Sequence, residues 1–183
     1  MKKIVALFSG EGTNLANLIE KIHHKHGLIT CAITNKPNAG GIAKAKTANI
    51  PVEVCDHREY ETREEYDKAL VEMIQEYDPD LVVLCGFMRI LTPIFTSGIK
   101  AINLHPSLLP AFKGSRAIER SFESDEKVCG VSVHWVSEEL DGGAIILQKS
   151  FTKNPNDTLE EFSAKIREIE HEILPLSVIQ ILK

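Results

Sequence analysis

The strongest constraint on the fold is a rhythm along the first half of the chain, in which short apolar runs alternate with longer amphipathic stretches. Apolar runs bounded by polar or turn-forming residues are typical of buried strands, and the stretches between them have helical length and periodicity. The expected strands cover residues 4–8, 28–34, 51–54, 81–85 and 101–104, and the expected helices cover residues 14–26, 41–48 and 62–77. This order predicts a Rossmann-like α/β fold around a buried parallel sheet.

The second half of the chain predicts an antiparallel extension of that sheet. A loop rich in proline and glycine at residues 105–114 leads to two strand-like runs at residues 128–136 and 144–151, which are expected to pair as a hairpin or to add antiparallel strands. The last segment opens with Thr158-Leu-Glu-Glu161, a capping-box pattern, and continues with apolar residues at helical spacing. It is expected to form a helix that lies on the sheet, and Pro175 is expected to kink or interrupt it.

Length and composition indicate one compact domain and exclude several classes of protein. A chain of 183 residues with 43% hydrophobic residues suits a single α/β domain over residues 1–183, with a mostly parallel sheet, helices on both faces and the antiparallel extension in its C-terminal part. Its net charge of −5 offers no basic surface to nucleic acid. Since no apolar run approaches the ~20 residues that span a bilayer, a cytoplasmic protein without membrane contact is expected.

Neither the cysteines nor the histidines predict a metal site. The four cysteines form no C-x-x-C pair, so they are interpreted as reduced, largely buried thiols. The histidine-rich segment at residues 23–26 is interpreted as a solvated helix end. We therefore expect no metal cofactor.

A glycine-rich turn, Ser9-Gly-Glu-Gly-Thr-Asn14, follows the first expected strand. Free backbone N–H groups and the positive end of a helix meet at such a turn, which suits a phosphate group. The dinucleotide-binding fingerprint requires a small residue where Leu15 stands, and the second strand ends in Thr34-Asn35 without an acidic residue for a ribose hydroxyl. The turn therefore indicates either a phosphate-bearing ligand other than NAD or a plain turn whose glycines serve the backbone.

Polar residues with catalytic potential gather beside two apolar segments. Asn103 and His105 are two residues apart at the carboxyl end of the fifth expected strand, so an extended backbone directs both side chains to the same side. Asp141 lies in Leu140-Asp-Gly-Gly143, between the two later strands. An amide donor beside an imidazole, with a carboxylate to orient it, suits the oxyanion of an acyl-transfer reaction. Taken alone, Asn103 and Asp141 are also common turn residues, and His105 before a proline also fits a capped loop histidine. No nucleophile-elbow pattern occurs, so the nucleophile is expected to come from the substrate.

Several motifs together resemble the folate-dependent formyltransferase family, and within it the branch that acts on glycinamide ribonucleotide. The motifs occupy residues 9–14, 86–91, 103–110, 130–136 and 140–143. The resemblance extends over essentially the whole chain, and it marks Asn103, His105 and Asp141 as the catalytic trio. It implies transfer of the formyl group of 10-formyltetrahydrofolate to the amino group of glycinamide ribonucleotide in de novo purine biosynthesis, with formylglycinamide ribonucleotide and tetrahydrofolate as products.

The resemblance also assigns residues to the two substrates. Gly12, Thr13 and Asn14 are expected to hold the phosphate, Glu170 to contact the ribose hydroxyls, and Arg167, one helical turn earlier, to assist the phosphate. The residues expected to form the folate pocket are Met88, Arg89, Ile90, Leu91, Asn103, Val136, Glu138 and Asp141. No residue of the loop 111–116 is given a catalytic role.

Other readings of the same motifs lead to different functions. A 10-formyltetrahydrofolate hydrolase shares the trio but is expected to carry an N-terminal regulatory domain, whereas the first strand here begins at residue 4. A methionyl-tRNA formyltransferase is expected to carry an RNA-binding domain and a basic surface. A non-catalytic nucleotide-binding module explains the glycine-rich turn but not the presence of Asn103, His105 and Asp141. We therefore expect only small-molecule partners, and a monomer or homodimer.

Overall fold

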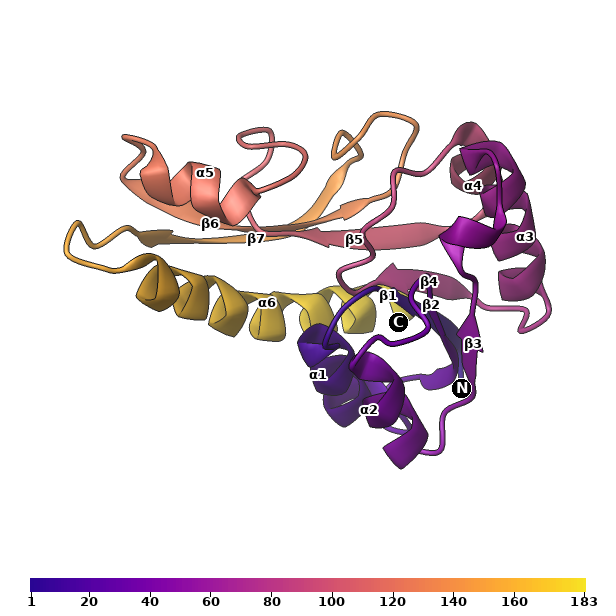
Figure 1. Cartoon of the computed structure of the whole chain (residues 1–183). Coiled ribbons are helices and arrows are strands. Elements are labelled where there is room, and N and C mark those ends of the chain that lie inside the picture. Colours follow the sequence, from indigo (N-terminus) through magenta and orange to yellow (C-terminus); the bar gives the residue numbers. More distant parts are fainter.

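A computed structural model describes residues 1–183 as a seven-stranded sheet with the strand order β3-β2-β1-β4-β5-β6-β7 (Figure 1). The strands are β1 (Lys3–Phe8), β2 (Leu28–Thr34), β3 (Val52–Val54), β4 (Leu81–Leu84), β5 (Ala101–His105), β6 (Val128–Trp135) and β7 (Ile145–Thr152). Strands β1 to β5 are parallel, whereas β6 runs antiparallel to both β5 and β7. This arrangement confirms the predicted mostly parallel sheet with an antiparallel extension in the C-terminal part.

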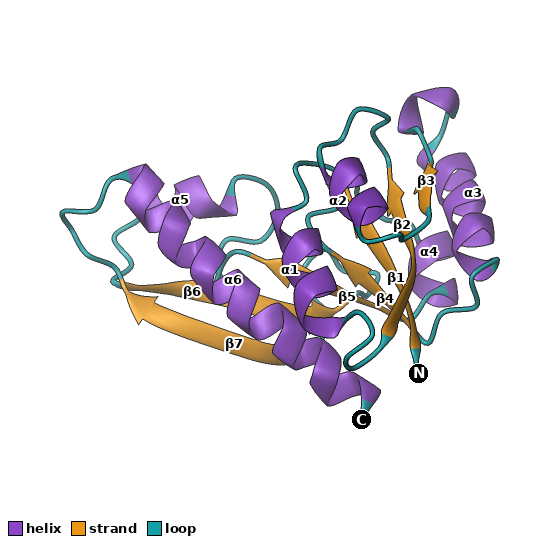
Figure 2. Ribbon diagram, turned by 90° about the horizontal axis from the view of Figure 1, so that it is seen from below, coloured by secondary structure: helices purple, strands orange, loops and turns teal.

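Helices cover both faces of the sheet (Figures 1 and 2). They are α1 (Thr13–Ile22), α2 (Gly41–Thr47), α3 (Arg63–Gln75), α4 (Pro93–Gly98), α5 (Ala117–Glu123) and α6 (Leu159–Leu182), with a short 3₁₀ helix η1 (His57–Glu59). Helices α1, α2 and α6 share one hydrophobic core with the sheet, whereas α3 and α4 share a second core on the opposite face. Helix α5 packs against α6, where the rings of Phe122 and Phe162 lie 5.5 Å apart between centroids.

The central strand β1 shows why the apolar runs are continuous. Ile4, Ala6 and Phe8 belong to the core under α1, α2 and α6, whereas Val5 and Leu7 belong to the core under α3. All five side chains are fully buried, because alternate residues of a strand face opposite sides of the sheet and both sides are covered.

Several helix boundaries differ from the predicted ones. The first helix was expected to reach residue 26 but ends at Ile22, because the chain turns through His24, whose φ is 62°, and the Ile29 N–H donates to Nδ1 of His23 at 3.1 Å. The short helices α4 and α5 and the helix η1 were not predicted, because segments of this length show too little periodicity to be recognised.

The expected interruption of the last helix at Pro175 is wrong. Helix α6 continues through this residue to Leu182, with Pro175 buried inside it (Figure 2). No helix of the structure has both the length and the apolar character that crossing a membrane requires.

Candidate active site

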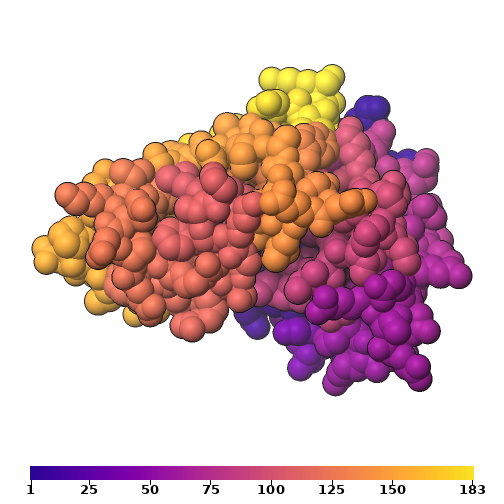
Figure 3. Space-filling model, turned by 90° about the horizontal axis from the view of Figure 1, so that it is seen from above, coloured from indigo at the N-terminus to yellow at the C-terminus, as the bar shows by residue number.

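The loops that follow the carboxyl ends of β4 and β5 meet the connection between β6 and β7 around one cavity of about 870 Å³. Figure 3 looks onto this side of the molecule, where the surface is hollowed between the orange atoms of the β6–β7 connection and the magenta-to-pink atoms near residue 90. Ligands of open α/β sheets bind at this end of the strands. The cavity is therefore the candidate active site.

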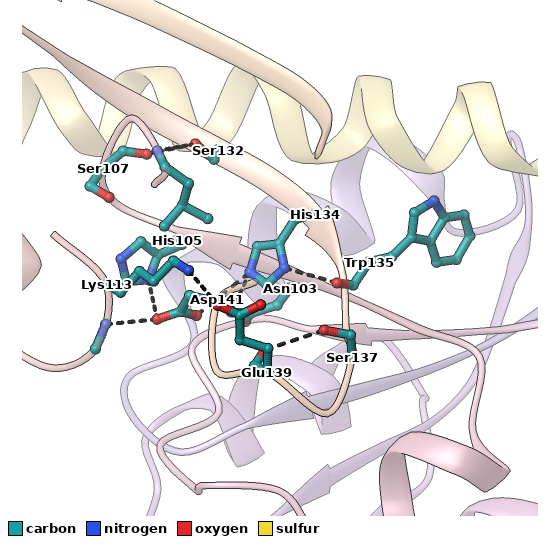
Figure 4. Close-up of polar contacts among 12 residues, drawn as sticks. Asn103, His105, Ser107, Lys113, Ser132, His134, Trp135, Ser137, Glu139 and Asp141 are labelled. Atoms are coloured by element: carbon teal, nitrogen blue, oxygen red, sulfur yellow. Dashed lines mark hydrogen bonds and ion pairs between the residues drawn. The ribbon is translucent and has the colours of Figure 1, made fainter. Parts of the chain in front are cut away.

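Asn103, His105 and Asp141 all line the cavity, as the sequence predicts. Asn103 and His105 lie on β5, and Asp141 reaches them from the β6–β7 connection (Figure 4). Nδ1 of His105 lies 3.5 Å from Oδ2 of Asp141, and both side chains are almost fully buried. The structure thus brings together two distant segments of the chain through the pairing of β5 with β6.

The two ring nitrogens of His105 both face oxygen acceptors. Nε2 lies 2.8 Å from the carbonyl oxygen of Phe112, and Nδ1 faces the Asp141 carboxylate. A carbonyl oxygen only accepts hydrogen bonds, so Nε2 is the donor there, and a proton on Nδ1 as well would satisfy the carboxylate. This arrangement suits a doubly protonated imidazole. Phe112 belongs to the loop to which the sequence assigned no role, and its backbone lies against the His105 imidazole.

Asp141 is held by more partners than the sequence predicted. The Gly114 N–H donates to its Oδ2 at 2.8 Å, and Nε2 of His134 lies 3.6 Å from its Oδ1. Burial by itself raises the pKa of Asp141, but the hydrogen bonds from His134 and Gly114 and the charges of His105 and His134 bring that pKa below its usual value. The carboxylate is therefore ionised at neutral pH and is available to hold a positive imidazole.

His134 is the residue of this cluster that the sequence analysis did not single out. It lies on β6 directly opposite Asn103 of β5, and its Nε2 is 3.3 Å from the Asn103 amide nitrogen. Its Nδ1 is 2.9 Å from the carbonyl oxygen of Trp135, which fixes the ring (Figure 4). Only the antiparallel register brings His134 to Asn103, and that register cannot be read from either segment alone.

The glycine-rich turn leads directly into α1. Gly12 has a φ of 74° and caps the helix, and a Cβ at this position would lie 2.7 Å from the Cα of Gly41. The first helical hydrogen bond runs from the Ala16 N–H to the Gly12 carbonyl at 2.8 Å, so the N–H groups of Thr13 and Asn14 have no partner inside the helix. Asn14 lines the cavity, whereas Gly12 and Thr13 are not among its lining residues.

Glu170 of α6 also lines the cavity and is joined to the turn by a side chain. Nδ2 of Asn14 donates to Oε2 of Glu170 at 3.0 Å. Burial raises the pKa of Glu170, opposed by this hydrogen bond and by the charge of Arg167. Arg167 is exposed and is not among the lining residues, so the structure brings Asn14 and Glu170 together but leaves Arg167 at the periphery.

The residues expected to contact folate all line the same cavity as the trio. They are Met88, Arg89, Ile90, Leu91, Val136 and Glu138, together with Asn103 and Asp141 of the trio. Met88 is 71% and Ile90 49% exposed, so the rim offers apolar surface.

The backbone of this rim segment is held at one end and free at the other. The Met88 N–H donates to Oγ of Ser9 at 2.8 Å, which joins the segment to the glycine-rich turn. The N–H groups of Arg89, Ile90 and Leu91 donate to no other group of the chain. The Arg89 guanidinium lies over the ring of Tyr66, 4.8 Å from its centroid.

Comparison with known proteins identifies the family. The formyl transferase family model matches residues 2–178. A phosphoribosylglycinamide formyltransferase of Haemophilus influenzae is 42% identical over 97% of this chain and 86% of that protein. The trifunctional purine biosynthetic protein adenosine-3 of Gallus gallus is 39% identical over 96% of this chain, which spans 18% of that longer protein.

Solved structures agree with the sequence matches. The crystal structure of phosphoribosylglycinamide formyltransferase from Campylobacter jejuni superposes with a TM-score of 0.97 at 56% identity, over 100% of this chain and 98% of the other. The likeness therefore includes the sheet, the cavity-forming loops and the sequence over nearly the full length. The chain belongs to the formyl transferase family.

Proposed function

We propose that the protein transfers the formyl group of 10-formyltetrahydrofolate to the amino group of glycinamide ribonucleotide, as an enzyme of purine biosynthesis. The observation that carries this proposal is the buried cluster of Asn103, His105 and Asp141, placed between a turn suited to phosphate and a rim suited to a pteridine. Relatives named for this activity match almost the whole chain.

The ribonucleotide is assigned to the α1–α6 side of the cavity. The free N–H groups of Thr13 and Asn14 and the positive end of α1 favour a phosphate at the Gly12 turn. The Glu170 carboxylate, held by Asn14, accepts hydrogen bonds from ribose hydroxyls. Arg167 adds positive charge near the phosphate from its exposed position on α6. The amine of the glycinamide group then points toward the trio.

The folate is assigned to the opposite side. A pteridine has two flat apolar faces and an edge of hydrogen-bonding atoms, and this chemistry fits the apolar rim at Met88 and Ile90 and the free N–H groups of residues 89–91. Leu91, Val136 and Glu138 complete this side, which ends at Asn103 and Asp141.

Transfer proceeds directly from one substrate to the other. The amine nitrogen attacks the formyl carbon, and the resulting oxyanion accepts hydrogen bonds from the Asn103 amide and from Nε2 of protonated His105. The formyl oxygen takes the place that the Phe112 carbonyl oxygen occupies against Nε2. Asp141 holds the charge on His105. As the bond from carbon to N10 of the folate breaks, a proton from the attacking amine passes to N10 through water oriented by Asp141.

The test is an assay of purified protein with 10-formyltetrahydrofolate in the presence and absence of glycinamide ribonucleotide. Tetrahydrofolate and formylglycinamide ribonucleotide are expected in equal amounts, and only when both substrates are present. Release of formate and tetrahydrofolate at the same rate without the ribonucleotide would identify a hydrolase. Binding of the ribonucleotide without turnover of either substrate would identify a binding module instead.

A further inference from the structure

Helix α6 contains a hydrogen-bond acceptor that its own backbone cannot satisfy. Pro175 lies buried inside the helix and has no N–H to donate to the carbonyl of His171, four residues earlier. The pyrrolidine ring also crowds that carbonyl, which is the usual cause of a kink or break. The helix nevertheless continues from Leu159 to Leu182.

The missing donor is supplied by another helix. Nδ2 of Asn17, on α1, donates to the carbonyl oxygen of His171 at 2.8 Å. Asn17 is 8% exposed and lies between the apolar residues Leu15 and Leu18, so its amide needs a partner inside the protein. The Asn17 side chain thus replaces the backbone hydrogen bond that Pro175 removes.

The same face of α1 holds the ribose-binding carboxylate. Asn14 and Asn17 are one helical turn apart, and Nδ2 of Asn14 donates to Glu170, the residue immediately before His171. Consecutive residues of α6 are therefore held by two amides of α1. Pro175 weakens α6 because one backbone hydrogen bond is missing there. The direction of the preceding helical turn, which carries Glu170, therefore depends on the hydrogen bond from Asn17 to the His171 carbonyl.

We propose that Asn17 is a positioning residue for the ribonucleotide: by capturing the carbonyl that Pro175 leaves free, it fixes the turn of α6 that presents Glu170 to the cavity. This role rests on the proposed contact of Glu170 with the ribose. Asn17 itself is not among the cavity-lining residues, so it acts through α6 and not on the substrate.

The test is a cycle of Asn17→Leu, Pro175→Ala and the double variant. Asn17→Leu keeps the side-chain size but removes the donor, and we expect KM for glycinamide ribonucleotide to rise about threefold to tenfold, while kcat and KM for 10-formyltetrahydrofolate stay within about twofold. Pro175→Ala alone is expected to behave as wild type. In the double variant the backbone N–H regained at position 175 bonds the His171 carbonyl, so KM for the ribonucleotide returns to the Pro175→Ala value.

Ser177→Ala is the matched control. Oγ of the buried Ser177 donates to the Ile173 carbonyl of the same helix at 2.7 Å, beyond Pro175 and away from the cavity, so its loss is expected to leave both KM values unchanged. Asn17→Ala serves in the same cycle if the leucine variant does not fold. An unchanged KM in a folded Asn17 variant, or a raised KM that Pro175→Ala does not relieve, would overturn the proposal.

Crystal structures of the four proteins separate this role from the proposed function. The distance from Nδ2 of Asn14 to Oε2 of Glu170 is expected to lengthen in Asn17→Leu and to return in the double variant. An identical α6 in all four structures would overturn the positioning role. If the helix shifts as expected but the wild-type protein does not formylate the ribonucleotide, the proposed function fails, whereas the placement of Glu170 by Asn17 stands.

Discussion

The Asp141 carboxylate holds together the buried cluster that includes His105 and His134. It accepts from the Gly114 backbone, faces His105 with one oxygen and His134 with the other, and is buried with both imidazoles. Its φ of 52° is unusual for a residue with a side chain. Because the partners share one carboxylate, we expect them to act as a unit.

Replacing His105 and Asp141 separately and together tests this coupling. Loss of one oxyanion donor typically lowers kcat ~10²–10³-fold, so His105→Ala and Asp141→Asn are each expected to cripple turnover. The double variant should be scarcely worse than the poorer single variant. Asp141→Asn should recover part of its kcat as the pH falls, since an ordinary histidine is protonated below a pKa of ~6.5. The measurement is kcat across a pH series, with circular dichroism as the check on folding.

Additive losses in the double variant would contradict the coupling. A folded His105→Ala enzyme with near-normal kcat would return His105 to the role of a buried strand-end residue.

His134 is expected to support catalysis through Asn103 and Asp141, without contacting either substrate. His134→Leu removes the group opposite Asn103 and leaves Oδ1 of Asp141 with one partner fewer. A buried polar group that loses its partner, here the Asn103 amide that faces Nε2 of His134 at 3.3 Å, costs about 1–3 kcal/mol. This corresponds to roughly a tenfold to hundredfold loss of kcat if the cost falls on the transition state. The exposed His26→Ala is the control. A His134→Leu enzyme with normal kcat and an unchanged pH profile would assign His134 to packing alone.

The ionised Glu170 side chain is expected to lower the stability of the folded protein while it contributes to ribonucleotide binding. Because burial raises its pKa in the folded state, the folded protein holds this proton more tightly than the unfolded chain. Stability is therefore lost as the pH rises from the ordinary value of 4.5 through the raised folded pKa, and the penalty is complete above it. Glu170→Gln should raise Tm at pH 7.5 but not at pH 4, while KM for the ribonucleotide rises. An equal Tm change at both pH values would show that ionisation is not the cause.

At the scale of elements, the glycine-rich turn at residues 9–14 depends on the packing of α1 against α2. Gly12 occupies the left-handed region and approaches Gly41 closely, and the Gly41 N–H donates to the carbonyl of Gly10 at 3.1 Å. The turn is therefore shaped by a neighbouring helix as well as by its own sequence.

Two substitutions in this turn should differ sharply. Gly12→Ala combines a positive φ with a Cβ placed against the Gly41 backbone, so we expect a loss of about 1–3 kcal/mol of stability and weaker ribonucleotide binding. Gly10→Ala is the matched control, because a Cβ there meets no atom within 4 Å and the φ is not positive. Denaturant unfolding and KM for the ribonucleotide measure both effects. Equal stabilities for the two variants would contradict the account of the turn.

At the scale of the whole molecule, one sheet separates two hydrophobic cores that share every central strand. Trp135 is the only tryptophan, and it ends β6 in the antiparallel part. Helices α1 to α3 connect the strands of the parallel part, from β1 to β4. Since β5 hydrogen-bonds to both β4 and β6, neither part has a sheet of its own. We propose that residues 1–183 form one cooperative domain.

Equilibrium unfolding tests this proposal. Trp135 fluorescence reports the antiparallel part and far-UV circular dichroism reports all helices, and the two urea transitions are expected to coincide. The two transitions should also coincide with each other in the Ser177→Ala variant, whatever its own stability change. A fluorescence transition that precedes the dichroism transition would indicate that the antiparallel part unfolds separately.

Features that depend on neighbouring residues or on single motifs can be predicted from the sequence alone. Strands buried on both faces need continuous apolar runs. Thr62 and Thr158 are the N-cap residues of α3 and α6, and both halves of a capping box form at each. The positions of Asn103 and His105 followed from strand alternation, and the roles of Glu170 and the folate-side residues came from family resemblance. These features depend on neighbours a few residues away or on whole motifs, so one chain segment is enough to reveal them.

Features that depend on contacts between distant segments are visible only in the folded structure. The register of β5 and β6 brings His134 to the cluster of Asn103, His105 and Asp141, and the path of the loop brings the Phe112 carbonyl to His105. The local rule that proline interrupts a helix failed at Pro175, where Asn17 of α1 donates to the carbonyl that the proline leaves without a backbone partner. Side chains far apart in the sequence can satisfy a backbone group once the fold brings them together, and no local pattern records that they will.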